Sequence, residues 1–118
     1  MMRPLDDAEV YLCRDIVDMR KSINGLSLLV EQTLELDPFA PQLFVFCNRK
    51  RDKVKILYWE RSGFVLWYKR LEKHRFPWPR EANEQTVTLT GRELNWLLDG
   101  IDLFRLKPHE NLSYRSVL

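Results

Sequence analysis

Residues 43–71 have the sequence LFVFCNRKRDKVKILYWERSGFVLWYKRL. The first five of these residues are all apolar, which predicts a central strand covered on both faces. The polar run Asn48–Asp52 has the length of a hairpin connection and leads into a second predicted strand, Val54–Trp59. A turn over residues 60–63, whose glycine is available for positive φ, leads into a third strand, Phe64–Leu71. These residues predict an antiparallel meander of three strands.

The sequence before the meander predicts one strand and one helix. Val10–Cys13 has the apolar character of a short strand. Asp18 is a suitable N-cap, and apolar residues recur at spacings of three and four from Met19 onward. We therefore expect an amphipathic helix that extends to about Leu36 and is stopped by Asp37-Pro38.

The sequence after the meander predicts a rigid segment, a strand and a short helix. Phe76-Pro77-Trp78-Pro79 cannot lie in the middle of a sheet, because its two prolines lack the N–H that a ladder needs. Gln85–Leu89 alternates apolar and polar residues, which is typical of a half-exposed strand. Thr90 and Glu93 have the spacing of a capping box, which would open a short helix ended by Gly100.

These elements together predict an α+β fold. We expect a single domain over residues 1–118, built on an antiparallel meander of three or more strands. One longer N-terminal helix and a short C-terminal helix would accompany the sheet. Residues 107–118 are expected to form a polar tail.

The composition indicates a globular protein of the reduced cytoplasm. The chain has 118 residues, of which 45% are hydrophobic and 12% aromatic, enough for a core of one domain. No apolar run approaches the roughly 20 residues of a membrane helix, and the N-terminus is acidic where a signal peptide would be apolar. Two cysteines are too few for a disulfide scaffold or for a zinc site by themselves. We therefore expect a cytoplasmic location and no membrane partner.

The net charge of +2 hides a strong segregation along the chain. Residues 1–48 carry four Lys or Arg against eight Asp or Glu, whereas residues 49–80 carry eleven against three. Most of the aromatic residues also lie between Phe44 and Trp78. This asymmetry favours an anionic partner, with nucleic acid the first candidate. The alternative is that long basic side chains only solubilise an aromatic-rich sheet.

The sequence contains few of the residues that catalysis requires. Its four glycines are far apart, so phosphate-loop and dinucleotide-binding motifs are absent. His74 and His109 have no neighbour at metal-ligand spacing, and Cys13 and Cys47 lie in apolar strands, where a thiol is usually buried. The pairs Asp15/Asp18 and Asp99/Asp102 are candidates for a metal-dependent nuclease, or else flank helix ends. We expect no catalytic residues, no metal and no cofactor.

The basic residues form two clusters that an antiparallel meander would bring to one end of the sheet. Together these clusters supply the candidate nucleic-acid-binding residues Arg49, Lys50, Arg51, Lys53, Lys55, Lys69, Arg70, Lys73 and Arg75. If a three-residue turn set the register, Lys55 and Lys69 would lie side by side, an arrangement that is costly without an anion nearby. Phosphate contacts of this kind position a duplex without reading its sequence.

Three blocks of sequence resemble a known family. They are residues 18–26 (DMRKSINGL), residues 37–39 (DPF) with residues 43–46 (LFVF), and a third block from Arg49 through residues 52–59, 63–64 and 68–73 to residues 75–79 (RFPWP). The chain resembles the small accessory proteins, called TnpB or second-frame products, that bacterial insertion sequences of family sixty-six encode. These are distinct from the RNA-guided nucleases of the same label. Cys47-Asn48 departs mildly from the family pattern, which would reduce the patch by one charge.

The resemblance implies a role in DNA transposition beside a separate transposase, and it supplies no catalytic residues. Our leading hypothesis is a non-catalytic accessory factor that binds DNA phosphates through the nine basic residues. The alternative is a protein–protein adaptor that contacts the transposase through Phe76 and Trp78, since Trp is a favoured interface anchor. These two side chains would otherwise cap the sheet. A second copy pairing with an exposed edge strand is conceivable, although the sequence does not indicate it.

Overall fold

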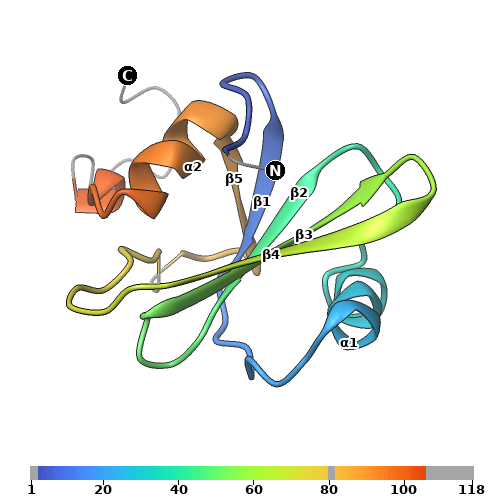
Figure 1. The fold of residues 1–118 in the computed structure, drawn as a ribbon, viewed down its shortest axis with the longest axis horizontal. Helices are drawn as coiled ribbons and strands as arrows, with labels where there is room; N and C mark the ends of the chain where they lie inside the picture. The colour runs from blue at the N-terminus through green and yellow to red at the C-terminus, as the bar shows by residue number, and fades with distance from the viewer. Residues whose placement is uncertain (1–2, 80–81, 106–118) are drawn as a thin grey trace.

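The computed structural model describes residues 3–79 and 82–105, which form a five-stranded sheet with helices on both faces (Figure 1). The strands are β1 (Glu9–Cys13), β2 (Leu43–Cys47), β3 (Lys53–Glu60), β4 (Gly63–Arg70) and β5 (Thr86–Thr90). Their order is β4-β3-β2-β1-β5, so β2 is the middle strand. All of β2 except Leu43 is buried, which confirms that this apolar run is a central strand.

The α+β class is confirmed, but the sheet is mixed and larger than the predicted meander. β2, β3 and β4 are antiparallel neighbours as expected. β1 adds to β2 in parallel, with Val10 opposite Leu43, and β5 pairs antiparallel with β1. A parallel pair requires a crossover connection, which here contains the first helix. Local periodicity does not reveal such a long-range pairing, so the prediction of an antiparallel meander as the whole basis of the fold was wrong.

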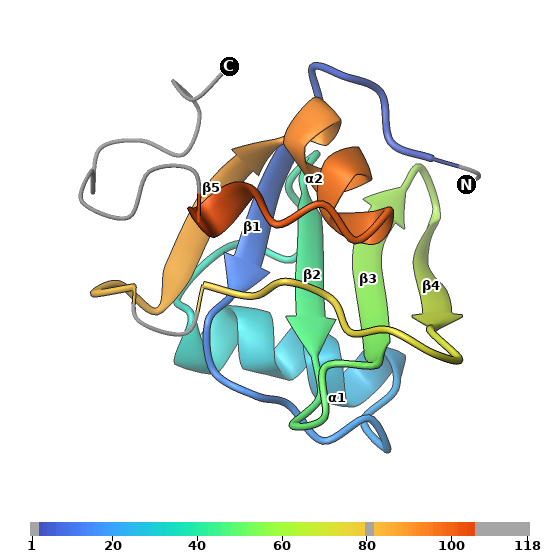
Figure 2. The same cartoon turned by 90° about the vertical axis from the view of Figure 1, so that its left-hand side faces the viewer.

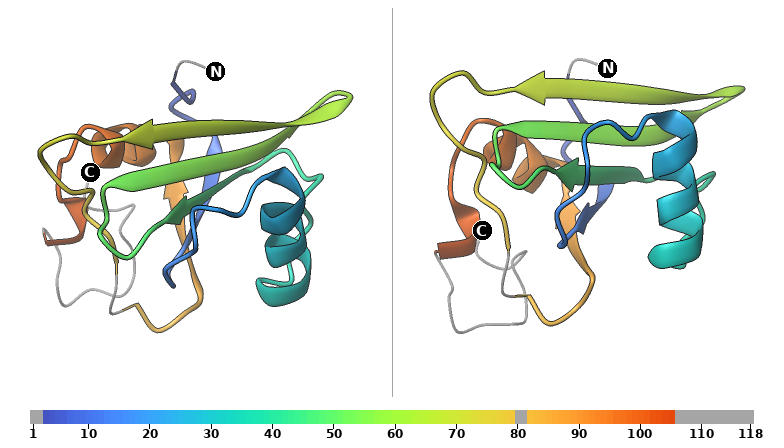
Figure 3. Two further views of the ribbon diagram at one scale, coloured as in Figure 1. Left: turned by 60° about the horizontal axis from the view of Figure 1, so that its bottom comes forward. Right: turned by 90° about the horizontal axis from the view of Figure 1, so that it is seen from below.

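The two faces of the sheet carry separate apolar clusters. On one face, α1 (Ile23–Leu28) and the π-helical turn η1 (Leu29–Thr33) contribute Leu26 and Val30, which pack against Phe44 and Phe46 of β2. On the other face lie α2 (Gly91–Leu98) and the 3-10 turn η2 (Leu103–Arg105). Figure 3 shows the sheet between these two layers. Figure 2 shows that the segment leaving β4 crosses the same face as α2.

The N-terminal helix is shorter than predicted and begins later. Its N-cap is Ser22, without a side-chain hydrogen bond, and its α-helical part has six residues against eight in α2. Asp18 is not the cap, because its carboxylate accepts from the backbone N–H and the guanidinium of Arg20. The helical turns end at Thr33, before Asp37-Pro38, and Glu35 is left-handed with φ 57°. The expected single helix from Met19 to Leu36 is therefore wrong in both of its limits.

The predicted capping box of α2 is confirmed in full. Thr90 Oγ1 accepts from the backbone N–H of Glu93 at 3.1 Å, and Glu93 Oε1 accepts from the backbone N–H of Thr90 at 2.8 Å. Two of the N–H groups that a helix start would leave unpaired are thus satisfied. Gly100, with φ 87°, follows the end of the helix as expected.

Other expectations have mixed outcomes. The predicted strand at Gln85–Leu89 is confirmed as β5. Gly63 does not adopt positive φ; Arg61 does so instead, with φ 54°. The predicted polar tail, residues 107–118, lies outside the described residues. Within the described ranges, no helix is long and apolar enough to cross a membrane.

Two glycines differ in the space that surrounds them, and this difference is testable. A Cβ on Gly91 would lie 1.7 Å from the backbone oxygen of Leu5, whereas a Cβ on Gly63 would meet nothing within 4 Å. We expect Gly91→Ala to lower the free energy of unfolding by about 1–3 kcal/mol, because backbone must move to make room. Gly63→Ala should change it by less than about 0.5 kcal/mol. Denaturant unfolding measures both, and equal effects would contradict the close approach at Gly91.

Candidate nucleic-acid interface

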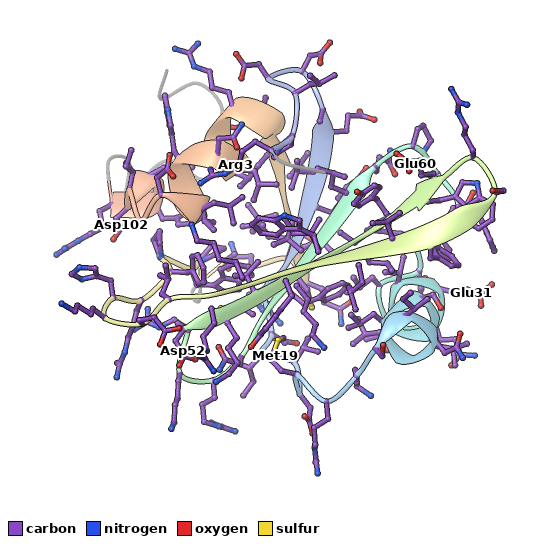
Figure 4. The ribbon with its side chains drawn as sticks, in the orientation of Figure 1. Arg3, Met19, Glu31, Asp52, Glu60 and Asp102 are labelled. Carbon is purple, nitrogen blue, oxygen red and sulfur yellow. The ribbon has the colours of Figure 1, made fainter. Side chains whose placement is uncertain are left out.

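The topology gathers most of the basic connections at one end of the sheet. β1, β2 and β4 finish at this end, and β3 and β5 begin there. We call it the basic end; it comprises residues 14–22, 48–53, 70–79 and 82–85, with ten Lys or Arg against five Asp or Glu. The opposite, acidic end comprises residues 3–9, 34–42 and 60–63, with two against six. In Figure 4, Asp52 and Glu60 mark these two ends of β3.

The β2–β3 hairpin is held rigidly by Asn48. Its Oδ1 accepts from the backbone N–H groups of Asp52 and Lys53 at 3.1 and 3.0 Å, and its Nδ2 donates to Asp52 Oδ1 at 2.7 Å. This last hydrogen bond is the main cause that lowers the pKa of Asp52. Arg51 completes the turn with φ 60°. Asn48, which the sequence placed at the start of the hairpin connection, therefore shapes the loop that presents Arg49 and Lys50.

The segment after β4 is joined to this hairpin by two backbone hydrogen bonds. Leu71 N donates to Asp52 O and Phe76 N donates to Arg51 O, each at 2.7 Å. Because Lys53 is also the cross-strand partner of Arg70, the two basic clusters meet at one end of the sheet, as the sequence predicted.

The prediction that Lys55 and Lys69 lie side by side on neighbouring strands is wrong. The β3–β4 turn has two residues between Glu60 and Gly63, which places Lys55 opposite Tyr68 and Val54 opposite Lys69. Side chains alternate between the faces of a strand, so the two lysines lie on opposite faces of the sheet.

Each of these lysines has a structural partner. Lys55 Nζ donates to Met19 O at 2.8 Å and to Lys21 O at 2.9 Å, which fastens the loop before α1 to the sheet. Lys69 Nζ donates to Leu98 O at 3.2 Å, at the C-terminal end of α2, where a cation is favoured by the helix dipole.

The nine candidate residues thus separate into two groups. Lys53 pairs with Asp52 at 3.5 Å and Arg70 with Glu72 at 2.9 Å, Lys55 and Lys69 hold backbone carbonyls, and Arg51 is half-buried in the turn. Four of the nine candidates are exposed and form no ion pair with any residue in 3–79 or 82–105: Arg49, Lys50, Lys73 and Arg75. These four are the side chains available to an anion.

A groove of about 950 Å³ lies beside the exposed part of the hairpin. One wall is the loop around Met19, the other carries Arg49 and Lys50, and Lys55 and Tyr68 lie between them. The Met19 loop and the hairpin both lie at the Asp52 end of the sheet in Figure 4. The contributions of Met19 and Tyr68 were not predicted, because the groove exists only where two distant loops meet.

One wall of the groove also carries a paired charge. Asp18 accepts from Arg20, with an Oδ2–Nη2 distance of 2.7 Å. This side-chain hydrogen bond is the main cause that lowers the pKa of Asp18 to about 2. Asp18 is therefore ionised at neutral pH, but its charge is offset by Arg20 and does not neutralise the hairpin.

Phe76 and Trp78, the candidate partner-binding residues, belong to the core. Their exposed fractions are 1% and 7%, and Trp78 Nε1 donates to Cys13 O at 3.0 Å. Both side chains pack in the apolar cluster under α2. This is the sheet-capping arrangement that the sequence left open, and neither ring is presented to a partner.

We expect Trp78→Ala to lower the free energy of unfolding by about 3–5 kcal/mol, because it leaves a large cavity and an unpaired carbonyl. Phe39→Ala, at a ring that is 55% exposed, is the control and should cost less than about 1 kcal/mol. Both values come from denaturant unfolding. A Trp78→Ala protein of unchanged stability would contradict the capping role and return Trp78 to the interface candidates.

Each of the four candidate catalytic carboxylates has an arginine as its ion-pair partner. Asp15 pairs with Arg14 and Asp18 with Arg20, while Asp99 pairs with Arg3 and Asp102 with Arg105. In the part of the chain that the structure describes, no three His, Cys, Asp or Glu residues lie where they could hold a metal ion. His74 is exposed, and His109 lies outside the described residues.

Cys13 and Cys47 are buried free thiols, as predicted. Burial raises the pKa of Cys13 to about 11 and that of Cys47 to about 12. We therefore expect neither thiol to react with an alkylating reagent near neutral pH until the protein unfolds. Labelling followed by mass spectrometry across a denaturant series should give two modifications that appear together with unfolding. Rapid labelling of the native protein would contradict the burial.

These features define a small α+β protein with an open cationic end. The sequence matches the family model described as IS66 Orf2 like protein over residues 8–108. The chain therefore belongs to this family, which is associated with transposition as an accessory component of insertion sequences.

Two relatives from Sinorhizobium fredii (strain NBRC 101917 / NGR234) are similar to most of the chain. The uncharacterized protein y4jC is 31% identical over 107 residues, which cover 91% of each chain. The uncharacterized protein y4hO is 33% identical over 96 residues, which cover 81% of this chain and 83% of its own. No solved structure matches the chain.

Proposed function

We propose that this protein is a non-catalytic accessory factor of transposition that binds DNA phosphates through its basic end. The observation that carries the proposal is the group of four exposed cations, Arg49, Lys50, Lys73 and Arg75, which have no ion-pair partner among the described residues. Like charges held close together repel one another, and an anion bound between them would relieve that repulsion.

The rigidity of the basic end supports the same function. Asn48 fixes the hairpin, and two backbone hydrogen bonds join it to the segment that carries Lys73 and Arg75. A cationic surface that is already ordered loses little conformational entropy when it binds. The adjoining groove of about 950 Å³ offers room beside the hairpin for a sugar–phosphate backbone.

The proposed contacts are to phosphates and not to bases. Arg and Lys at a loop tip supply positive charge without a helix or ribbon that enters a groove of the duplex. Binding should therefore be salt-sensitive and largely independent of sequence. A specific site in the element would then have to be chosen by another component.

The test is the double variant Arg49→Glu/Lys50→Glu, measured by fluorescence anisotropy with labelled DNA over a salt series. We expect affinity at low salt to fall at least about tenfold, and the slope of log affinity against log salt to decrease in magnitude by about two. Lys55 and Lys69 are less suitable positions, because each holds a backbone carbonyl and its loss would disturb the fold.

The matched control is Arg61→Glu/Arg92→Glu. Both residues are exposed and lie away from the basic end, and the change in net charge is the same. We expect a smaller loss of affinity and an unchanged salt slope. If both variants lose the same affinity for DNA, the loss is explained by net charge and not by the position of the cations. A wild-type protein that binds no DNA even at low salt would refute the proposal.

The second candidate function is contact with the transposase of the same element. It is favoured by a partly exposed aromatic cluster at the acidic end, where the ring centroid of the exposed Phe39 lies 5.0 Å from that of Trp59 and 5.2 Å from that of Phe64. Aromatic side chains are typical interface anchors. The adaptor function would thus use this cluster in place of the buried Phe76 and Trp78, and it becomes the leading proposal if DNA binding is absent.

A further inference from the structure

The outer edge of β4 is a strand edge without a partner among the described residues. β4 has eight residues, and five consecutive ones, Phe64–Tyr68, are apolar or aromatic. None of these residues is fully buried, and Tyr68 is 49% exposed. Among residues 3–79 and 82–105, no strand pairs with β4 on the side away from β3. Figure 2 shows β4 at the margin of the sheet.

The hydrogen-bond pattern identifies which peptide groups face outward. The two-residue turn makes Glu60 and Gly63 a hydrogen-bonded pair, and such pairs recur at every second position of an antiparallel ladder. The hydrogen bond from Leu71 N to Asp52 O continues this alternation beyond the strand. The N–H and C=O groups that point away from β3 are therefore those of Phe64, Leu66, Tyr68 and Arg70.

The edge lacks the devices that usually protect such strands. β4 has no proline, its pairing with β3 is continuous over eight residue pairs without a bulge, and its only charges are the last two residues. One of these, Lys69, donates its hydrogen bond to Leu98 O, on the face that carries α2. The other edge strand, β5, has only five residues, and Thr86, Thr88 and Thr90 alternate with its apolar positions.

We propose that two copies of this chain pair antiparallel through β4 to form a continuous ten-stranded sheet. The charge distribution selects a second copy as the partner, because β4 runs from the acidic end to the basic end of the molecule. Antiparallel pairing about a two-fold axis sets the basic end of each copy beside the acidic end of the other. The positive and negative ends of the two copies therefore face each other, and the same surface of each copy forms the interface, as a closed two-fold dimer requires.

One register satisfies all the outward groups. Phe64 lies opposite Arg70 of the second copy and Leu66 opposite Tyr68 of the second copy, so all four outward residues of each strand are paired. Trp67 then meets Trp67 of the second copy on the two-fold axis, at a non-hydrogen-bonded position. The cations of the two strands lie at opposite ends of the interface and do not face one another.

The first test compares Tyr68→Pro with Tyr68→Val by sedimentation equilibrium. Proline removes the outward N–H of Tyr68 and leaves the β3–β4 ladder intact, whereas valine retains that N–H. We expect the wild type to be a monomer–dimer equilibrium whose dissociation constant rises with salt. Tyr68→Pro should raise that constant by at least roughly tenfold, because the substitution occurs twice in the interface, and Tyr68→Val should raise it much less.

A second test reads the register directly and does not depend on the proline variant. Trp67→Cys should give a disulfide-linked dimer on mild oxidation, because Cα atoms at a non-hydrogen-bonded pair lie about 4.5 Å apart. Val65→Cys, two residues away on the same face, is the matched control and should not cross-link, because it faces position 69. The native thiols do not interfere, since Cys13 and Cys47 are buried. Circular dichroism confirms that each variant is folded.

The possible results separate clearly. Dimers that dissociate in Tyr68→Pro, or cross-links at position 67 and not at position 65, support the proposal. A wild-type protein that stays monomeric at all concentrations overturns it, as would a dimer that Tyr68→Pro leaves intact together with equal cross-linking at both positions. Sedimentation and cross-linking are measured without DNA, so a failure of this proposal is distinguishable from a failure of the proposed phosphate binding.

Discussion

The two-residue turn between β3 and β4 fixes the register that decides which side chains of β4 face α2 and which of its peptide groups point outward. Because Glu60 faces Gly63, every later pair along the hairpin is determined, down to Lys53 opposite Arg70. A shift of one residue would move each side chain of β4 to the other face of the sheet. It would remove Lys69 from the end of α2 and replace the outward peptide groups of β4 by a different set.

The basic residues of this chain serve two purposes, and only the structure separates them. Lys55 and Lys69 donate hydrogen bonds to backbone carbonyls. Lys55 does so at the loop before α1, and Lys69 at the end of α2. Arg49 and Lys50 extend from a hairpin that Asn48 holds in shape. Membership in the IS66 Orf2-like family supplies the genetic setting, and the available cations supply the physical basis of the proposed function.

The proposed DNA contacts and the proposed self-association would act together. Antiparallel pairing through β4 would place the two basic ends at opposite ends of the shared interface. Two phosphate-binding surfaces on one particle would raise the apparent affinity for a long DNA without any new contact. A factor that lacks base contacts of its own would gain avidity in this way, while the choice of site stays with another component.

The sequence by itself determined the elements that local chemistry controls. The apolar run of β2, the capping box of Thr90 and Glu93, the ending at Gly100 and the meeting of two basic clusters all follow from residues close together in the chain. Only the tertiary structure decided the parallel pairing of β1 with β2, the burial of Trp78 and the opposite faces of Lys55 and Lys69. The reason is that periodicity reports which positions are apolar, whereas strand partners and register depend on contacts between residues far apart in sequence. Asp18 shows a different and local limit, because its carboxylate accepts from the backbone N–H and the guanidinium of Arg20, two residues away, and does not cap the helix.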